Sequence, residues 1–153
     1  SLLSATGAFS AQRVGISMPK QLLYLATPYS SDADGIRIAR HALACKCAAN
    51  LLEAGFLVFS PIAHSHYIAA VGKLPSGFDY WREFDEAMIS VADAVCVALM
   101  DGWDQSDGVR REMDYARSVS TPIYCCNANG RVVHYGEPTD AAARRLEDHV
   151  VGG

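Results

Sequence analysis

The chain has 153 residues, of which half are hydrophobic and a fifth are charged, and its formal net charge is -4. This composition is typical of one globular domain with a sizeable core, and it excludes an intrinsically disordered chain. The acidic balance, without any run of Lys or Arg, argues against a protein that binds nucleic-acid polymers.

Residues 1–17 mix small, polar and apolar side chains, and they include no apolar stretch long enough for a signal peptide or a membrane span. We expect them to form a flexible N-terminal arm, with residues 18–153 as a single folded domain. We expect no membrane partner and a cytoplasmic location. The five cysteines lie in stretches typical of helix or buried strand, which favours reduced thiols over a disulfide framework.

The first half of the domain predicts two strands and one long helix. Residues 22–26 form an apolar run that stops at Thr-Pro, as a buried strand does. Apolar residues spaced three and four apart predict a helix over 34–53, and Gly55 ends it. Residues 56–59 are a second strand. Residues 62–76, with two histidines and a Lys-Leu-Pro-Ser-Gly turn, predict an irregular excursion over the sheet.

The second half alternates helices and strands in the same way. Helical spacing returns over 78–91, and residues 94–99 predict a central parallel strand because they are apolar on both faces. A polar loop over 101–107 follows this strand. The remaining expected elements are a helix at 108–118, a strand at 121–125, a short strand at 131–134 and a helix at 139–149.

This alternation predicts a three-layer α/β/α sandwich, flavodoxin-like or Rossmann-like, around a largely parallel sheet of four or five strands. In such a sheet the ligand lies beyond the carboxyl ends of the strands, where the strand order reverses. Three loops should therefore converge on the site, at residues 27–31, 60–66 and 100–107.

The first of these loops excludes two common cofactors. It has neither the glycines of a dinucleotide fingerprint nor the Gly-Lys-Ser/Thr of a P-loop, so we expect no nicotinamide and no ATP. Tyr29 offers a ring with a polar tip, and Ser30 lies beside a helix start, where free N–H groups favour an anion. Both are candidate substrate-binding residues. A capping serine and a tyrosine that fills the rim are the alternative.

The loop after the central strand provides the main catalytic candidate. It contains Asp101, Trp103, Ser106 and Gly108, and Glu112 is expected in the first turn of the helix that follows, facing the pocket. The positive helix end would keep this carboxylate ionised. The alternative is a glutamate that only complements the helix dipole.

A second carboxylate, Asp85, lies on the helix that leads into the central strand and has aromatic neighbours. Two carboxylates that face one crevice can divide their roles, one as nucleophile and the other as orienter or proton carrier. Asp93 and Asp114 are competing candidates. However, Asp93 lies at a helix end, and Asp114 follows Glu112 by two residues and points elsewhere.

His64 and His66 are residue types that bind zinc, but no third ligand with metal-site spacing accompanies them. On a strand-like segment the two rings would also point to opposite faces. We therefore expect no metal. Either histidine can line the pocket as a proton donor or hydrogen-bond partner, and a structural role for both is the alternative.

Together these motifs resemble the nucleoside 2-deoxyribosyltransferase-like superfamily, most closely its small bacterial and phage-associated branch. The resemblance spans residues 22 to 125. It is carried by Leu-Ala-Thr-Pro-Tyr-Ser at 25–30, Phe-Ser-Pro-Ile-Ala-His-Ser-His at 59–66, Asp85, and Gly-Trp-x-x-Ser-x-Gly-Val-x-x-Glu-Met-x-Tyr-Ala at 102–116. Members of this superfamily cleave the N-glycosidic bond of nucleosides or nucleoside 5′-monophosphates and pass the sugar to another base or to water.

The resemblance implies a role for each matching residue. Glu112 matches the nucleophile that attacks the anomeric carbon, and Asp85 matches the aspartate that positions it or handles the proton of the base. Tyr29 matches an aromatic position near the sugar and base. Ser106 matches a serine that contacts the 5′-phosphate, which favours a nucleoside 5′-monophosphate as substrate.

The sequence departs from the family pattern around Ser106, the residue that matches the phosphate-binding serine. Asp104 and Asp107 flank Ser106, and their charges would repel a phosphate unless a nearby cation offsets them. Three arginines are candidates for this offset: Arg37, Arg40 and Arg110. The Pro-Gly-Gly-x-Gly-Thr motif of related phosphoribohydrolases is missing from the sequence.

The alternative function is a non-catalytic nucleotide-binding module or sensor of the same fold. In either case the expected partner is a small nucleotide or nucleoside. The resemblance also implies a homo-oligomer, for which Phe78, Tyr80 and Trp81 are candidate interface residues. Core packing is the alternative role for these three side chains.

Overall fold

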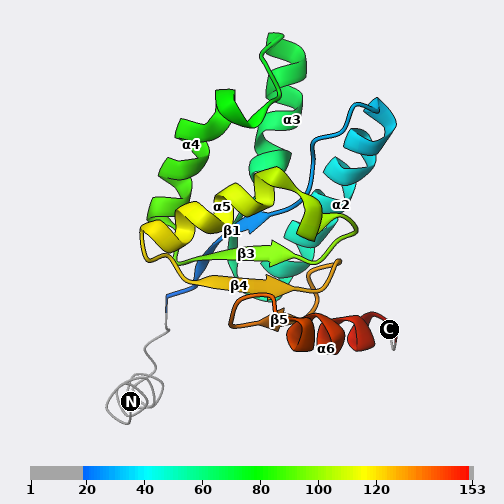
Figure 1. The fold of residues 1–153 in the computed structure, drawn as a ribbon, viewed down its shortest axis with the longest axis vertical. Helices are drawn as coiled ribbons and strands as arrows, with labels where there is room; N and C mark the ends of the chain where they lie inside the picture. The colour runs from blue at the N-terminus through cyan, green and yellow to red at the C-terminus, as the bar shows by residue number, and fades with distance from the viewer. Residues whose placement is uncertain (1–18, 152–153) are drawn as a thin grey trace.

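The computed structural model describes residues 19–151, and the arm expected at residues 1–17 lies outside the described residues. Five strands form one sheet in the order β2-β1-β3-β4-β5 (Figure 1). The strands are β1 (Leu22–Ala26), β2 (Leu57–Phe59), β3 (Ala94–Ala98), β4 (Ile123–Cys126) and β5 (Val133–His134). The first four run parallel to one another, and β5 pairs antiparallel with β4. The predicted, mostly parallel sheet with a central third strand is confirmed.

Helices cover both faces of the sheet, as a three-layer sandwich requires (Figure 1). They are α2 (Asp34–Glu53), α3 (Pro61–Gly72), α4 (Phe78–Val91), α5 (Asp107–Ser118) and α6 (Asp140–Val151), with a short 3₁₀ helix, η1, at Trp103–Gln105. No helix of residues 19–151 has the length and apolar character needed to cross a membrane.

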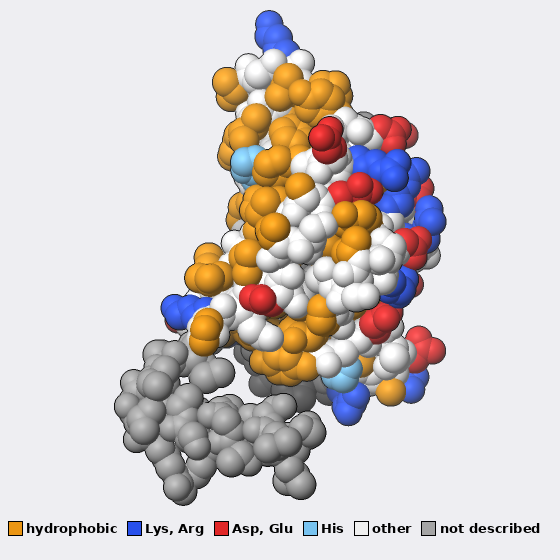
Figure 2. Space-filling model, turned by 90° about the vertical axis from the view of Figure 1, so that its left-hand side faces the viewer, with side chains coloured by type: hydrophobic (Ala, Val, Ile, Leu, Met, Phe, Trp, Pro, Cys, Tyr) orange, Lys and Arg blue, Asp and Glu red, His pale blue; other side chains and the backbone are white. Residues whose placement is uncertain are grey.

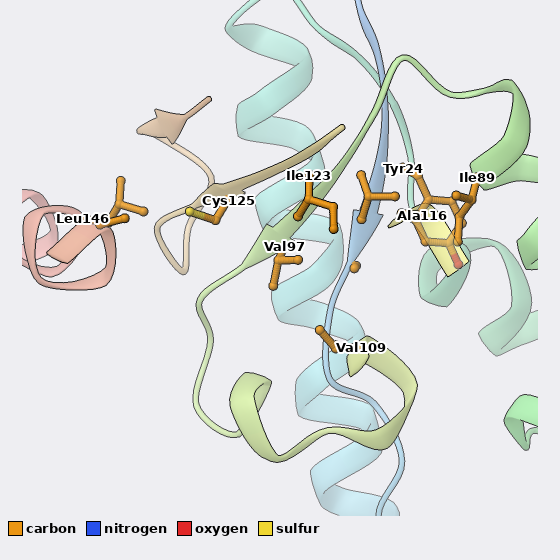
Figure 3. Close-up of a cluster of buried hydrophobic side chains, with 11 residues drawn as sticks. Tyr24, Ile89, Val97, Val109, Ala116, Ile123, Cys125 and Leu146 are labelled. Atoms are coloured by element: carbon orange, nitrogen blue, oxygen red, sulfur yellow. The ribbon is translucent and has the colours of Figure 1, made fainter. Parts of the chain in front are cut away.

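Alternation along the strands divides the core into two clusters, one on each face of the sheet. Tyr24 and Val97 pack with Ile89 of α4 and Val109 of α5 on one face (Figure 3). The neighbouring strand residues point the other way and pack against α2, where buried members include Leu23, Leu25, Cys47 and Cys96. All five cysteines are free thiols, and four of them are buried.

Helix α3 corrects the prediction of an irregular excursion over residues 62–76. Ser60 caps the helix, since its Oγ accepts a hydrogen bond from the Ala63 N–H at 3.2 Å, and Pro61 occupies the first turn, where a missing N–H costs nothing. Small and apolar residues occur on all sides of α3, so no one-sided pattern marked it as a helix. His64 and His66 therefore lie on a helix, not on a strand.

The strand order reverses between β1 and β3, because the chain runs outward from β1 to β2 and then returns to the other side of β1. This order is that of the flavodoxin-like sheet, in which ligands bind at the β1/β3 reversal. Figure 1 shows the loops that follow β1 and β3 at the same end of the sheet. The loop after β2 leaves at this end too, because β2 runs parallel to β1.

Candidate active site

A cleft of about 500 Å³, open to solvent, lies at the carboxyl ends of β1 and β3. The loop after β1, the start of α3, the turn between α3 and α4, and the first turns of α5 form its walls. Six of the sequence-predicted site residues line it: Tyr29, Ser30, Asp85, Ser106, Gly108 and Glu112.

The other four predicted site residues lie outside this cleft. The ring of His64 stacks on Phe84, with centroids 4.9 Å apart. His66 lines an adjoining hollow, where its Nδ1 is 2.7 Å from the Tyr29 hydroxyl oxygen. Trp103 packs against the core cluster of α4 and α5, and Asp101 lines a separate hollow beside α6.

Glu112 is the buried acid of the cleft. It is the sixth residue of α5, in the second turn and not the expected first, and only 7% of its surface is exposed. The hydroxyl of Tyr24, a fully buried residue of β1, donates a hydrogen bond to its Oε2. The prediction that the helix end keeps the Glu112 carboxylate ionised is also wrong. Burial raises the pKa of Glu112 to about 8, although the Tyr24 hydrogen bond opposes this rise and the charge of Asp85 adds to it.

Asp85 approaches the same cleft from α4. Burial raises its pKa to about 7, as its aromatic surroundings suggested. Since two acids in one poorly solvated pocket interact, their protons leave in two steps that belong to the pair. Burial therefore favours the protonated form of each acid in the free protein.

The two competing carboxylates have structural partners elsewhere. Asp93 accepts a hydrogen bond from the Leu22 N–H at 2.7 Å and so joins the end of α4 to β1. Asp114 forms a surface ion pair with Arg117, with 3.0 Å between Oδ1 and Nη1. Neither lines the cleft.

Sequence reasoning missed two polar side chains at the cleft, one that contacts Glu112 and one that lines the cleft wall. Tyr24 reads as an ordinary core residue of a buried strand, and only the packing of α5 on β1 brings its hydroxyl to Glu112. Thr27 follows β1, lines the cleft and is 4% exposed, yet within the described part of the chain its Oγ1 has no hydrogen-bond partner. A polar residue at the end of a strand in the first loop was the available signal for Thr27.

The cleft is lined by two acidic side chains, Asp85 and Glu112. Among residues 19–151, no group of three or more His, Cys, Asp or Glu side chains is placed to hold one. These two acids come from the middle turns of α4 and α5, and both line the cleft, where they can exchange protons with a bound molecule.

A family model described as a domain of unknown function, DUF1937, matches residues 21–128. The chain belongs to this family. The matched range contains every residue that lines the cleft, so the candidate site lies wholly within the DUF1937 domain.

A solved structure of a 2-deoxyribosyltransferase from the psychrotolerant bacterium Bacillus psychrosaccharolyticus is similar to this DUF1937 chain. The two share 21% sequence identity, the alignment covers 82% of this chain and 81% of that chain, and the TM-score is 0.47. No curated protein matches the chain.

Proposed function

We propose that this DUF1937 protein cleaves the N-glycosidic bond of a nucleoside 5′-monophosphate, with Glu112 as the nucleophile. The observation that carries the proposal is a pair of acids in one cleft, one of which is fixed by a buried tyrosine hydroxyl. The motifs at residues 25–30, 59–66 and 102–116, which resemble those of nucleoside 2-deoxyribosyltransferases, point to the same reaction.

The chemistry needs two acids with different roles. As the bond between C1′ and the base nitrogen breaks, positive charge develops on the sugar, and the Glu112 carboxylate attacks C1′ to form a glycosyl ester. The departing base takes a proton at a ring nitrogen, which Asp85 supplies. Water or a second base then attacks C1′, the ester bond breaks to free Glu112, and the proton of the attacking group returns to Asp85.

The proton of the acid pair must therefore reside on Asp85 in the reacting complex. In the free protein burial raises the pKa of Asp85 and also that of Glu112, which must be ionised to act as the nucleophile. Two interactions favour its ionised form once a nucleotide is bound: the hydrogen bond donated by Tyr24 and the positive charge that develops on the sugar.

Other cleft residues fit a nucleoside. The Thr27 hydroxyl is buried without a partner in residues 19–151, which costs free energy until a ligand supplies one, and a sugar hydroxyl is such a partner. Phe78 and Trp81 line the cleft with aromatic rings on which a base can pack. The Trp81 indole N–H donates to the Pro75 carbonyl at 2.9 Å, which holds that ring in place.

The test is incubation of the purified protein with ribo- and deoxyribonucleosides and their 5′-monophosphates, with and without a second base, followed by chromatography for free or exchanged base. We expect release from monophosphates by the wild type and a loss of at least a hundredfold in Glu112→Gln. Glu83→Gln, which removes an exposed acid from α4, is the matched control and should keep full activity. Tight binding of an intact nucleotide without any release would instead identify a non-catalytic sensor.

We also propose that the protein acts as a homo-oligomer through the apolar side of α3 and α4. Figure 2 shows apolar side chains gathered on this side of the molecule, next to a strip of charged groups. The exposed apolar residues of α3 and α4 include Val71 (83%), Tyr67 (65%) and Tyr80 (50%). Phe78 and Trp81, which the sequence suggested for an interface, are half-buried and line the cleft. Sedimentation of a fully active monomer would refute this proposal.

A further inference from the structure

A second hollow adjoins the candidate active site. It is open to solvent, measures about 630 Å³ and lies between α2, α3 and the loop after β1. Tyr29, Ser65 and Ser76 line both hollows, so the two are continuous across these three side chains. A single ligand can therefore extend from one into the other.

The two hollows differ in charge. Of the described residues, those that line the cleft include the acids Asp85 and Glu112 but no Arg, Lys or His, although Arg40 donates a hydrogen bond to the Ser30 carbonyl beside it at 2.8 Å. Within residues 19–151, the adjoining hollow is lined by Arg37 and His66 and by no acid. A ligand that spans both would place a group of cationic character near the acids and an anionic group near Arg37.

Two contacts hold Arg37 at the edge of this hollow, one with a residue of α2 and one with the segment just before α2. Its guanidinium donates to the Ser31 carbonyl and pairs with Asp34. The Asp34 side chain is 84% exposed, so this ion pair is worth little, and a guanidinium has five N–H groups of which these contacts use only part. The Arg37 charge also reaches Tyr29, whose pKa is raised by burial and lowered in part by that charge.

The opposite wall adds hydrogen-bonding groups in fixed positions. His66 is held by Tyr29, with 2.7 Å between Nδ1 and the hydroxyl oxygen, and by stacking on His41 with centroids 4.0 Å apart. When Tyr29 donates to Nδ1, the neutral ring carries its own proton on Nε2 and can donate it. Ser65 and Ser76 contribute two hydroxyl groups.

We propose that the hollow between Arg37 and His66 binds the phosphate of the substrate, while the sugar and base occupy the cleft. This inference rests on the proposed function and assigns the anionic part of the nucleotide to residues of α2 and α3. A bound phosphate would accept hydrogen bonds from the guanidinium, from the serine hydroxyls and from the imidazole.

The resemblance places the phosphate at Ser106, at the start of α5. The charges around Ser106 are less favourable for a phosphate than those of the hollow beside Arg37. Ser106 Oγ already accepts a hydrogen bond from the Val109 N–H at 3.2 Å and so caps the helix. The exposed acids Asp104 and Asp107 flank it, and Arg110 pairs with Asp107 at 3.2 Å. No cation of this segment lines the cleft.

The first test is a titration of the ¹⁵N-labelled wild-type chain with inorganic phosphate, followed by NMR. We expect saturable shifts at Tyr29, Ser65 and His66, at least a tenfold weaker affinity in Arg37→Gln, and tighter binding in Asp34→Asn, which leaves Arg37 uncompensated. Lys46→Gln, which removes an exposed cation from the same helix, should bind as the wild type does. Shifts confined to residues 106–109, or no saturable shift, would overturn the proposal.

The second test compares nucleosides with their 5′-monophosphates in the base-release assay. We expect Arg37→Gln to raise KM for the monophosphate at least tenfold without changing KM for the nucleoside. The same selective effect in Ser106→Gly, with none in Arg37→Gln, would place the phosphate at α5 and overturn the inference. Absence of base release by the wild type would refute the proposed function alone, because the phosphate titration needs no turnover.

Discussion

Replacing Glu112 by Gln should stabilise the folded protein, and by an amount that grows with pH. In the folded state burial raises the pKa of Glu112 from its ordinary value of 4.5 to about 8. A tenfold change in acidity corresponds to about 1.4 kcal/mol, so ionising this buried group costs the folded state up to about 5 kcal/mol. The unfolded chain ionises it without this cost. A glutamine keeps an acceptor for the Tyr24 hydroxyl and never ionises.

The sign follows from proton binding. Between pH 4.5 and about 8 the folded state holds the Glu112 proton more tightly than the unfolded state, so the stability of the wild type falls as pH rises. Because Asp85 shares part of the effect, we expect Glu112→Gln to be more stable by about 2 to 4 kcal/mol at pH 9 and nearly equal at pH 5.

The assay is thermal unfolding followed by circular dichroism across this pH range. For a domain of this size the expected difference corresponds to a gain in Tm of roughly 6 to 12 °C at pH 9. Glu83→Gln should show the same small difference at both pH values. A Tm difference for Glu112→Gln that does not change with pH, or a loss of stability at pH 9, would refute the reasoning.

Three further predictions concern activity and folding. The pH profile of kcat/KM for base release should be bell-shaped with a narrow optimum between about 7 and 8, because below it both acids are protonated and above it neither is. A flat profile would contradict the raised pKa values of the two acids. Tyr24→Phe should lower kcat about ten- to hundredfold and move the acidic limb of the pH profile to higher pH, since Glu112 loses the donor that stabilises its ionised form. If the hydroxyl only fills space, steady-state kinetics would show that this limb has not shifted. Gly130→Ala should lower the free energy of unfolding in urea by at least about 2 kcal/mol. Gly130 has a φ of 75°, and a Cβ there would lie 2.6 Å from the Cys47 carbonyl oxygen. An unchanged urea midpoint would show that this turn relaxes freely.

The order and type of most elements could be predicted from the sequence because each carries a local signal. The helix predicted over 78–91 is α4 with the same bounds, and β1 also begins and ends where its apolar run does. Helix α3 was not predicted, because its small and apolar residues lie on all sides of the helix and leave no one-sided pattern. The Ser60-Pro61 pair was nevertheless a helix-start signal that the sequence contained.

The candidate site was less accessible to sequence reasoning. The carboxyl ends of the strands and the order reversal brought Glu112 and Asp85 into one cleft as predicted. Their protonation was not predictable from position along a helix, because it depends on how α4 and α5 close over β1 and exclude water. The hydroxyl of Tyr24 likewise becomes a partner of Glu112 only through this packing.

The position of Tyr24 affects how the family can diversify. Tyr24 is among the largest fully buried side chains of the core, and it also supports the acid of the cleft. A substitution of Tyr24 would disturb the fold and the support of Glu112 together. We therefore expect few substitutions to be tolerated at this inner side of the site, its floor. The outer wall at residues 76–81 consists of exposed and half-buried side chains on a turn and a helix start. We therefore expect relatives to acquire new substrate preferences through this wall while the floor stays fixed.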